Sequence, residues 1–175
     1  MKLIGIDPGI NGGLAFFNDK KLLAAIKMPS YNYTVGISKK QKKRQMIDGK
    51  EVAKLFKTFN PDFVFIEKVG AMPKQGVTST FNFGFSTGIL HGVCSALNLN
   101  FETVRPQEWK KIVIDDTEKD KEAAILFCET NYPNISLLPT KRSKKPHDGI
   151  ADAICIAVYG LSKKIIINKH IEEPV

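Results

Sequence analysis

The chain has 175 residues, enough for one domain with a hydrophobic core and too few for two large lobes. Its 26 Lys and Arg residues against 18 Asp and Glu residues give a net charge of +8, which favours a polyanionic partner such as nucleic acid. The three cysteines are far apart, without the paired spacing of a zinc site, and indicate a reducing compartment. No run of eighteen apolar residues is present, so we expect no membrane span, no signal peptide and a cytoplasmic location.

The first third of the chain predicts an antiparallel meander of three strands, at residues 2–6, 13–17 and 21–28. Glycines and the pair Asn18 and Asp19 supply the turns between them. Residues 29–47 are polar and contain the basic run KKQKKR, so we expect a mobile basic loop that either contacts DNA or stays solvated.

The middle of the chain predicts two helices around a buried strand. Asp48 is placed to cap a helix over residues 50–59, and the continuous apolar run at residues 63–66 is typical of a strand buried on both faces. A second helix covers residues 79–97. It carries a stripe of small residues that we expect to pack on the sheet, with a two-fold dimer contact as the alternative: Gly84, Gly88, Gly92 and Ala96.

The last part alternates strand and helix. A short strand at residues 101–104 precedes a short helix that begins at Pro106, and Thr117 caps a helix that runs to about residue 131. The final helix is predicted from about residue 147 to 161, and residues 165–175 are predicted to be a tail. This order of elements predicts a single α/β domain over residues 1–175, with helices on the faces of a mixed sheet.

Four carboxylates stand at the ends of apolar segments. Asp7 ends the run KLIGID, Glu67 ends FVFIE, and Asp148 and Asp152 have the i, i+4 spacing that directs both to one side of a helix. Each of them alone would be an ordinary turn residue or helix cap. Gathered together, the four like charges would repel unless a cation held them. Because hard oxygen ligands suit Mg²⁺ or Mn²⁺, we expect a divalent metal site.

Three motifs, in this order and at this spacing, resemble the RuvC family of Holliday junction resolvases. They are the N-terminal IDPGxxxG pattern, the strand that ends in IE, and the sequence ADA at the start of a late helix. The resemblance extends from Lys2 to about Tyr159 and looks closest to short phage-encoded members, through the stretches MPKQGVTSTFNFG and RPQEWKK. It implies a ribonuclease H-like fold: a mixed five-stranded sheet with an antiparallel N-terminal meander and helices on both faces. It also implies a homodimer that cuts two opposed strands of a four-way DNA junction with metal held by four acidic residues.

Carried over residue by residue, the resemblance assigns Asp7, Glu67 and Asp152 to the acidic set. Many bacterial members place an Asp or His three residues before the final aspartate, where this chain has Gly149, whereas other branches place an acidic residue four before it. Helical spacing favours Asp148 as the fourth member, with His147 as the competing ligand. Hydrolysis with two metal ions per site would use Asp7 as the bridging ligand.

Basic residues complete the expected site. Lys110 and Lys119 line up with positions that the family uses near the scissile phosphate, and Lys119 is expected to stabilise the transition state. The family's aromatic wedge position is Gly70 here, so Met72 or a Phe of FNFGF is the candidate replacement. Two clusters are expected to line the path of the DNA arms: Lys39, Lys40, Lys42, Lys43 and Arg44, and then Lys141, Arg142, Lys144 and Lys145.

The function expected from these residues is structure-selective, metal-dependent cleavage of four-way DNA junctions, without a nucleotide cofactor. Two alternatives share the same motifs. One is a related nuclease that acts on flaps, forks or other branched nucleic acid, and the other is a module that binds branched DNA without cutting it. An actin-like kinase or ATPase also begins with a strand that ends in Asp, but it needs two such domains, and the basic charge of this chain disfavours it.

Overall fold

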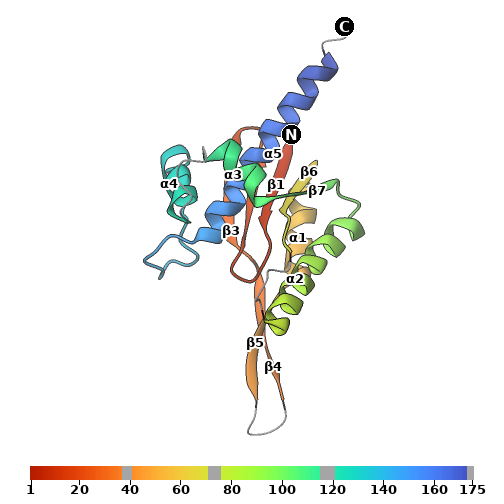
Figure 1. The fold of residues 1–175 in the computed structure, drawn as a ribbon, viewed down its shortest axis with the longest axis vertical. Helices are drawn as coiled ribbons and strands as arrows, with labels where there is room; N and C mark the ends of the chain where they lie inside the picture. The colour runs from red at the N-terminus through yellow and green to blue at the C-terminus, as the bar shows by residue number, and fades with distance from the viewer. Residues whose placement is uncertain (37–40, 71–75, 115–120, 173–175) are drawn as a thin grey trace.

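A computed structural model describes residues 1–36, 41–70, 76–114 and 121–172. Its centre is a five-stranded sheet with the strand order β3-β2-β1-β6-β7 (Figure 1). The middle strand, β1, is antiparallel to β2 and parallel to β6. The predicted meander and mixed five-stranded sheet are therefore confirmed. The strands of this sheet are β1 (Lys2–Asp7), β2 (Gly13–Asn18), β3 (Lys21–Lys27), β6 (Phe63–Glu67) and β7 (Phe101–Val104).

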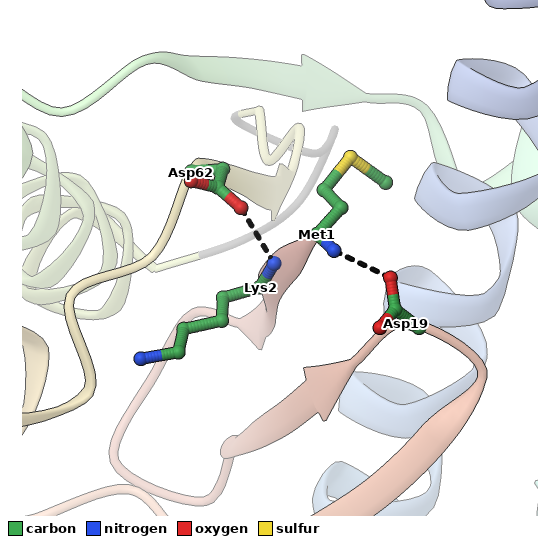
Figure 2. Close-up of polar contacts among 4 residues, drawn as sticks. All are labelled: Met1, Lys2, Asp19 and Asp62. Carbon is green, nitrogen blue, oxygen red and sulfur yellow. Dashed lines mark hydrogen bonds and ion pairs between the residues drawn. The ribbon is translucent and has the colours of Figure 1, made fainter.

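Polar contacts hold the beginning of β1 on both sides (Figure 2). The amine of Met1 binds the carboxylate of Asp19, which lies in the turn between β2 and β3. The backbone N–H of Lys2 donates to Asp62 Oδ2 at 2.7 Å, and the backbone N–H of Asp62 donates back to the carbonyl oxygen of Lys2 at 2.8 Å. These contacts fix the register of the strand that carries Asp7 at its other end.

Alternate residues of the strands build two hydrophobic cores, one on each face of the sheet. Leu3 and Phe65 point to the face covered by α3, α4 and α5, whereas Ile4 and Val64 point to the face covered by α1 and α2. Helices thus lie on both faces, as predicted, and this explains why β6 is apolar without alternation. The helices are α1 (Gly49–Phe59), α2 (Val77–Ala96), α3 (Pro106–Val113), α4 (Lys121–Asn131) and α5 (Asp148–Glu172).

Helix α5 crosses β1 and β2 so closely that only glycine fits at the contacts. A Cβ added to Gly5 would lie 2.3 Å from the carbonyl oxygen of Ala153 and 2.5 Å from the backbone nitrogen of Ala157. A Cβ added to Gly13 would lie 2.5 Å from the carbonyl oxygen of Gly149. This backbone-to-backbone packing sets the beginning of α5 beside the end of β1.

Helix α1 is capped at both ends. Asp48 Oδ1 accepts a hydrogen bond from the backbone N–H of Glu51 at 3.0 Å, which confirms the predicted N-cap. The helix ends at Asn60, whose φ of 54° is left-handed and whose N–H donates to the carbonyl oxygen of Phe56 at 2.8 Å.

Helix α2 begins at Val77, two residues before the predicted start, and its buried residues are Ser86, Leu90 and Cys94. The small-residue stripe does not pack on the sheet, so that expectation is wrong. Glycine, serine and threonine are frequent in α2, so its two sides differ little in hydrophobicity. The sequence therefore did not show which side is buried. Within the described part of the chain, open space surrounds a Cβ built on each glycine of the stripe: Gly84, Gly88 and Gly92.

Residues 29–47 do not form the predicted mobile loop. Strands β4 (Ser30–Val35) and β5 (Lys42–Ile47) pair in antiparallel fashion as a separate two-stranded sheet, which projects from the body of the molecule (Figure 1). Tyrosine, threonine and valine favour strand formation in β4. In β4, Tyr31, Tyr33 and Val35 alternate with polar residues, which is a strand signal that our prediction overlooked. Its partner β5 is a basic run without such alternation, and both faces of the ribbon are largely exposed.

Helix α5 is longer than predicted and extends beyond the body of the molecule (Figure 1). It runs to Glu172, so most of the predicted tail at residues 165–175 is helical. No glycine or proline occurs between Gly160 and Pro174, so the sequence contains no signal that would end the helix earlier.

Helix α3 begins at Pro106, as predicted, whereas the predicted cap Thr117 lies outside the described residues. Among the helices of the described ranges, none is both long and apolar enough to cross a membrane.

The contact between α5 and β1 predicts the effect of Gly5→Ala. The added methyl group would overlap backbone atoms of α5, and overpacking of this kind costs about 1–3 kcal/mol. We therefore expect a lower Tm in thermal unfolding, by about 2–4 °C per kcal/mol. Gly70→Ala is the matched control, because Gly70 has open space around its Cβ position and such a change stays within about 0.5 kcal/mol. Equal Tm values for the two variants would contradict the packing described.

Candidate active site

Asp7 lies at the end of the central strand, within electrostatic range of three other carboxylates. Burial is the main cause that raises its pKa well above the ordinary value, followed by the charges of Glu67, Asp152 and Asp148. Lys110 acts in the opposite direction. The structure therefore brings the four predicted acidic residues within electrostatic reach of one another, although they come from three distant parts of the sequence.

Glu67 ends β6, the parallel neighbour of β1. Burial raises its pKa, whereas a hydrogen bond from Trp109 and the charge of Lys110 lower it. The Trp109 Nε1–H donates to Glu67 Oε1 at 2.9 Å, and this indole is fully buried. Lys110 Nζ lies 5.3 Å from the centre of the indole ring. Sequence analysis did not assign this role to Trp109, although it stands beside Lys110 in the stretch RPQEWKK.

The other two carboxylates occupy the first turns of α5. Asp148 begins the helix and Asp152 follows one turn later, so the helical spacing that the sequence predicted is present. Asp148 Oδ1 accepts a hydrogen bond from the backbone N–H of Gly149 at 3.0 Å, and its side chain is half-exposed.

His147 precedes the first turn of α5. Its carbonyl oxygen accepts hydrogen bonds from the backbone N–H groups of Ile150 and Ala151. Its Nδ1 atom is buried, has no hydrogen-bond partner among the described residues, and lies 3.9 Å from Asp148 Oδ1. The pKa of His147 is lowered, mainly by burial and also by the charge of Lys27, whereas the charge of Asp148 acts in the opposite direction. The net shift favours the neutral imidazole.

Gly149 leaves no room for a side chain three residues before Asp152. A Cβ on Gly149 would lie 2.2 Å from the carbonyl oxygen of Asn11, 2.7 Å from Gly12 Cα and 2.9 Å from Asp7 Oδ2. A side chain three residues before Asp152 would therefore collide with the turn that follows β1. This packing supports the alignment that places an acidic residue four positions before the final aspartate.

A cleft of about 530 Å³ opens at this end of the sheet. Its walls are the turn after β1, the first half of α2 and the beginning of α5, so Asp7, Asp148 and Asp152 share it. Ser86 is a buried polar side chain on the α2 wall. The remaining lining residues are Pro8, Gly9, Ile10, Asn11, Gly12, Ser79, Asn82, Phe83 and Gly149.

The acidic residues at this end of the sheet suit a hard divalent cation, because Asp7, Asp148 and Asp152 in the cleft and the nearby Glu67 all offer carboxylate oxygens. In the described residues, however, no three His, Cys, Asp or Glu side chains lie close enough to hold one ion together. Asp148 accepts a hydrogen bond at Oδ1 and Glu67 accepts one at Oε1, and each carboxylate has a second oxygen. The fourfold ligand set stays a prediction.

The predicted basic residues divide into three groups. Lys110 lies at the carboxylates, since its charge lowers the pKa of both Asp7 and Glu67. Lys119, Lys39 and Lys40 lie outside the described residues. The others are exposed on β5 or on the loop that leads into α5: Lys42, Lys43, Arg44, Lys141, Arg142, Lys144 and Lys145.

The aromatic residues of α2 point in two directions. Phe83 lines the cleft, where its ring lies 3.3 Å from a Cβ position built on Gly9. Phe81 and Phe85 are exposed, and their rings stack at a centroid distance of 6.2 Å. Gly70 is exposed and Met72 lies outside the described residues, so the identity of the aromatic wedge stays a prediction.

The central mixed sheet, its antiparallel N-terminal meander and the helices on both faces make this a ribonuclease H-like fold, which is the class that the resemblance predicted.

Solved structures share this architecture. Thermus thermophilus RuvC in complex with Holliday junction substrate has a TM-score of 0.61 and 18% sequence identity, over 94% of this chain and 96% of that one. Another structure of T. thermophilus RuvC has a TM-score of 0.57 and 19% identity, with the same coverage. The yeast mitochondrial Holliday junction resolvase, Ydc2, has a TM-score of 0.53 and 12% identity, over 96% of this chain and 82% of that one. No protein-family model matches the sequence, and no curated protein matches it.

The raised pKa of Asp7 predicts how pH affects the metal-free protein. In the unfolded chain Asp7 loses its proton near pH 4, but in the folded chain it keeps the proton to a higher pH. The folded state therefore binds more protons in that window, and its stability falls as pH rises through it. Asp7→Asn does not ionise, so in chelator at pH 8 we expect its Tm to exceed that of the wild type by about 2–4 °C per kcal/mol gained. The Tm difference between Asp7→Asn and the wild type should vanish near pH 4, where Asp7 keeps its proton in the folded protein.

Thermal scans across this pH range measure the effect. Asp48→Asn is the control, because asparagine caps a helix as well as aspartate does. If wild type and Asp7→Asn unfold at the same temperature at pH 8, burial and the neighbouring charges do not disfavour ionised Asp7 as described.

Proposed function

We propose that this protein is a metal-dependent endodeoxyribonuclease that resolves four-way DNA junctions by paired phosphodiester hydrolysis. The observation that carries the proposal is the Asp7 carboxyl at the end of the central strand, whose pKa is raised first by burial and then by the charges of Glu67, Asp152 and Asp148. The shared fold supports it, because one of the structures of that fold is RuvC in complex with Holliday junction substrate.

Four residues would hold the metal: Asp7, Glu67, Asp148 and Asp152. We propose Mg²⁺ or Mn²⁺, with two ions per site. Bound there, the ions would polarise the phosphoryl oxygens and lower the pKa of the attacking water. Asp7 is the natural shared ligand, because it stands between the strand that carries Glu67 and the helix that carries the other two.

Neighbouring side chains prepare the carboxylates for this role. The hydrogen bond from Trp109 and the charge of Lys110 both favour the ionised form of Glu67, which is the form that binds a cation. Lys110 also favours ionised Asp7 and brings a positive charge to the place where a scissile phosphate would bind. Lys119 is proposed to stabilise the transition state, as its position in the sequence suggests.

Paired cleavage needs two sites, and we propose that a homodimer supplies them through α2. One side of this helix is exposed along its length, although it is apolar or without side chains. Val77 is 86% exposed and Phe81 is 70% exposed, which are high values for large apolar side chains. The exposed glycines would allow two copies of α2 to approach closely across a two-fold axis. The same side of the helix carries Phe85 and three glycines of the small-residue stripe: Gly84, Gly88 and Gly92.

The positive charge around the cleft suits DNA. The loop that carries Lys141, Arg142, Lys144 and Lys145 leads directly into Asp148, so it would meet the DNA arm beside the cleavage site. The free, buried cysteines agree with a reducing compartment, and we propose the cytoplasm: Cys94, Cys128 and Cys155.

Cleavage assays test the proposal. Purified protein is incubated with a synthetic four-way junction, a fork, a flap and a plain duplex, with Mg²⁺ and with chelator. We expect junction cleavage that requires Mg²⁺, and Asp7→Asn should abolish it while binding to the junction persists. Cutting by Asp7→Asn at the wild-type rate would refute the metal site.

Two further outcomes distinguish the alternatives. Preferential cutting of forks or flaps identifies a related nuclease with another substrate. Tight junction binding without any nicked product in Mg²⁺ or Mn²⁺ identifies a non-cleaving module.

Asp48→Asn is the matched control for Asp7→Asn in the cleavage assays, because it removes one negative charge at the start of α1, away from the cleft.

Gly88→Leu tests the proposed dimer. The new side chain has open space in one subunit, so the fold should persist, but it would separate two closely packed copies of α2. We expect light scattering to show a dimer for the wild type and a monomer for Gly88→Leu, with paired cleavage replaced by single nicks. Thr58→Leu adds an apolar side chain to an exposed position of α1 and should leave the dimer intact. A dimeric Gly88→Leu would place the interface elsewhere.

A further inference from the structure

The β4–β5 hairpin begins at the same end of the sheet as the cleft. Asp7 pairs with Gly13, and Gly13 pairs with Lys27, the last residue of β3. Two strand spacings separate the backbones of Asp7 and Lys27, a distance of about 10 Å. Directly after Lys27, the backbone N–H of Met28 donates to the carbonyl oxygen of Gly12, which lines the cleft, at 3.0 Å.

The root of the hairpin is fixed to the core. Met28 is 2% exposed and Ile47 is 1% exposed, and both belong to the core beneath α1 and α2. The backbone N–H of Asp48 donates to the carbonyl oxygen of Pro29 at 2.9 Å, which closes the base of the ribbon. Beyond this point, six residues of each strand reach outward, a length of about 20 Å.

The hairpin concentrates positive charge. Residues 29–47 contain four lysines and one arginine and no acidic residue. Lys42, Lys43 and Arg44 are exposed, and none of them forms an ion pair within the described part of the chain. A ribbon with uncompensated positive charge is suited to a polyanion.

The strand register defines the two faces of the ribbon. Tyr31 lies opposite Met46, and Tyr33 lies opposite Arg44, so both tyrosines and Arg44 share one face. Tyr31 Oη donates to Met46 Sδ at 3.3 Å, and the tyrosine rings are 6.2 Å apart with a tilt of 50°. Lys43 lies on the other face, opposite Thr34. Cations therefore occur on both sides, and the tilted rings do not form a flat platform for stacked bases.

We infer that the β4–β5 hairpin is a DNA-binding arm that lies along a double-stranded segment next to the cleavage site. A two-stranded ribbon fits the major groove, which is about 12 Å wide, and cations on both faces of the ribbon can then reach both phosphate backbones. Its length of about 20 Å corresponds to about six base pairs. This inference rests on the proposed function for the position of the duplex relative to the cleft, but binding to duplex DNA can be measured without cleavage.

The triple variant Lys42→Ser/Lys43→Ser/Arg44→Ser tests the arm. Binding of the full-length protein to a plain duplex and to a four-way junction is measured in chelator over a range of salt concentrations. Each lost phosphate contact lowers the steepness of log Kobs against log salt by about 0.9, so we expect a decrease of about 2–3 and weaker binding to both DNAs. Lys42→Arg/Lys43→Arg keeps the charge and should keep the wild-type slope.

Lys20→Ser/Lys21→Ser/Lys57→Ser is the matched control. It removes the same charge from exposed positions at the opposite end of the sheet, where Lys21 pairs with Asn18 and Asn18 pairs with Lys2. An unchanged slope for the hairpin variant, or an equal loss for the control, overturns the inference. Absence of junction cleavage in the wild type would refute the proposed nuclease but leave the duplex measurement valid.

Discussion

The site depends on the backbone packing of α5 against β1 and β2. Gly5 and Gly13 let the helix approach until its backbone is in contact with the strands, and Gly149 lets its first turn reach the loop after Asp7. No side chain separates these elements, so the carboxylates of α5 are held beside the end of the central strand. Burial first and charge repulsion second raise the pKa of Asp7, and packing of the sheet and helices must offset the cost of its ionised form.

The parts of the fold that could be predicted from the sequence are those with a local physical signal. Strands β1 and β6 are apolar runs that end in a carboxylate, Asp48 is a side-chain cap, and Asp148 and Asp152 have helical spacing. Each signal involves residues within a few positions of one another. The convergence of these segments followed from the family resemblance, and the structure shows it in the electrostatic coupling of Asp7.

Other features have no local signal. Trp109 binds a carboxylate 42 positions earlier in the chain, a contact that depends on the neighbouring placement of β6 and β7. Only one strand of the hairpin, β4, has an alternating pattern, and its partner β5 is a basic run that resembles a solvated loop in the sequence. The stripe of α2 has a clear period, but the period alone does not tell whether Gly88 faces the sheet or the solvent. Partner surfaces and core surfaces look alike in a sequence when both are built from small residues.

Helix α2 connects the cleft with the exposed face at which the dimer is proposed. Phe83 and Ser86 on its inner side form a wall of the cleft, whereas Phe81 and Phe85 on its outer side meet solvent. In the proposed dimer the outer sides of two α2 helices would face each other, so only this pair of helices would stand between the two clefts. The spacing of the two clefts would then be set by how closely the small-residue stripes approach.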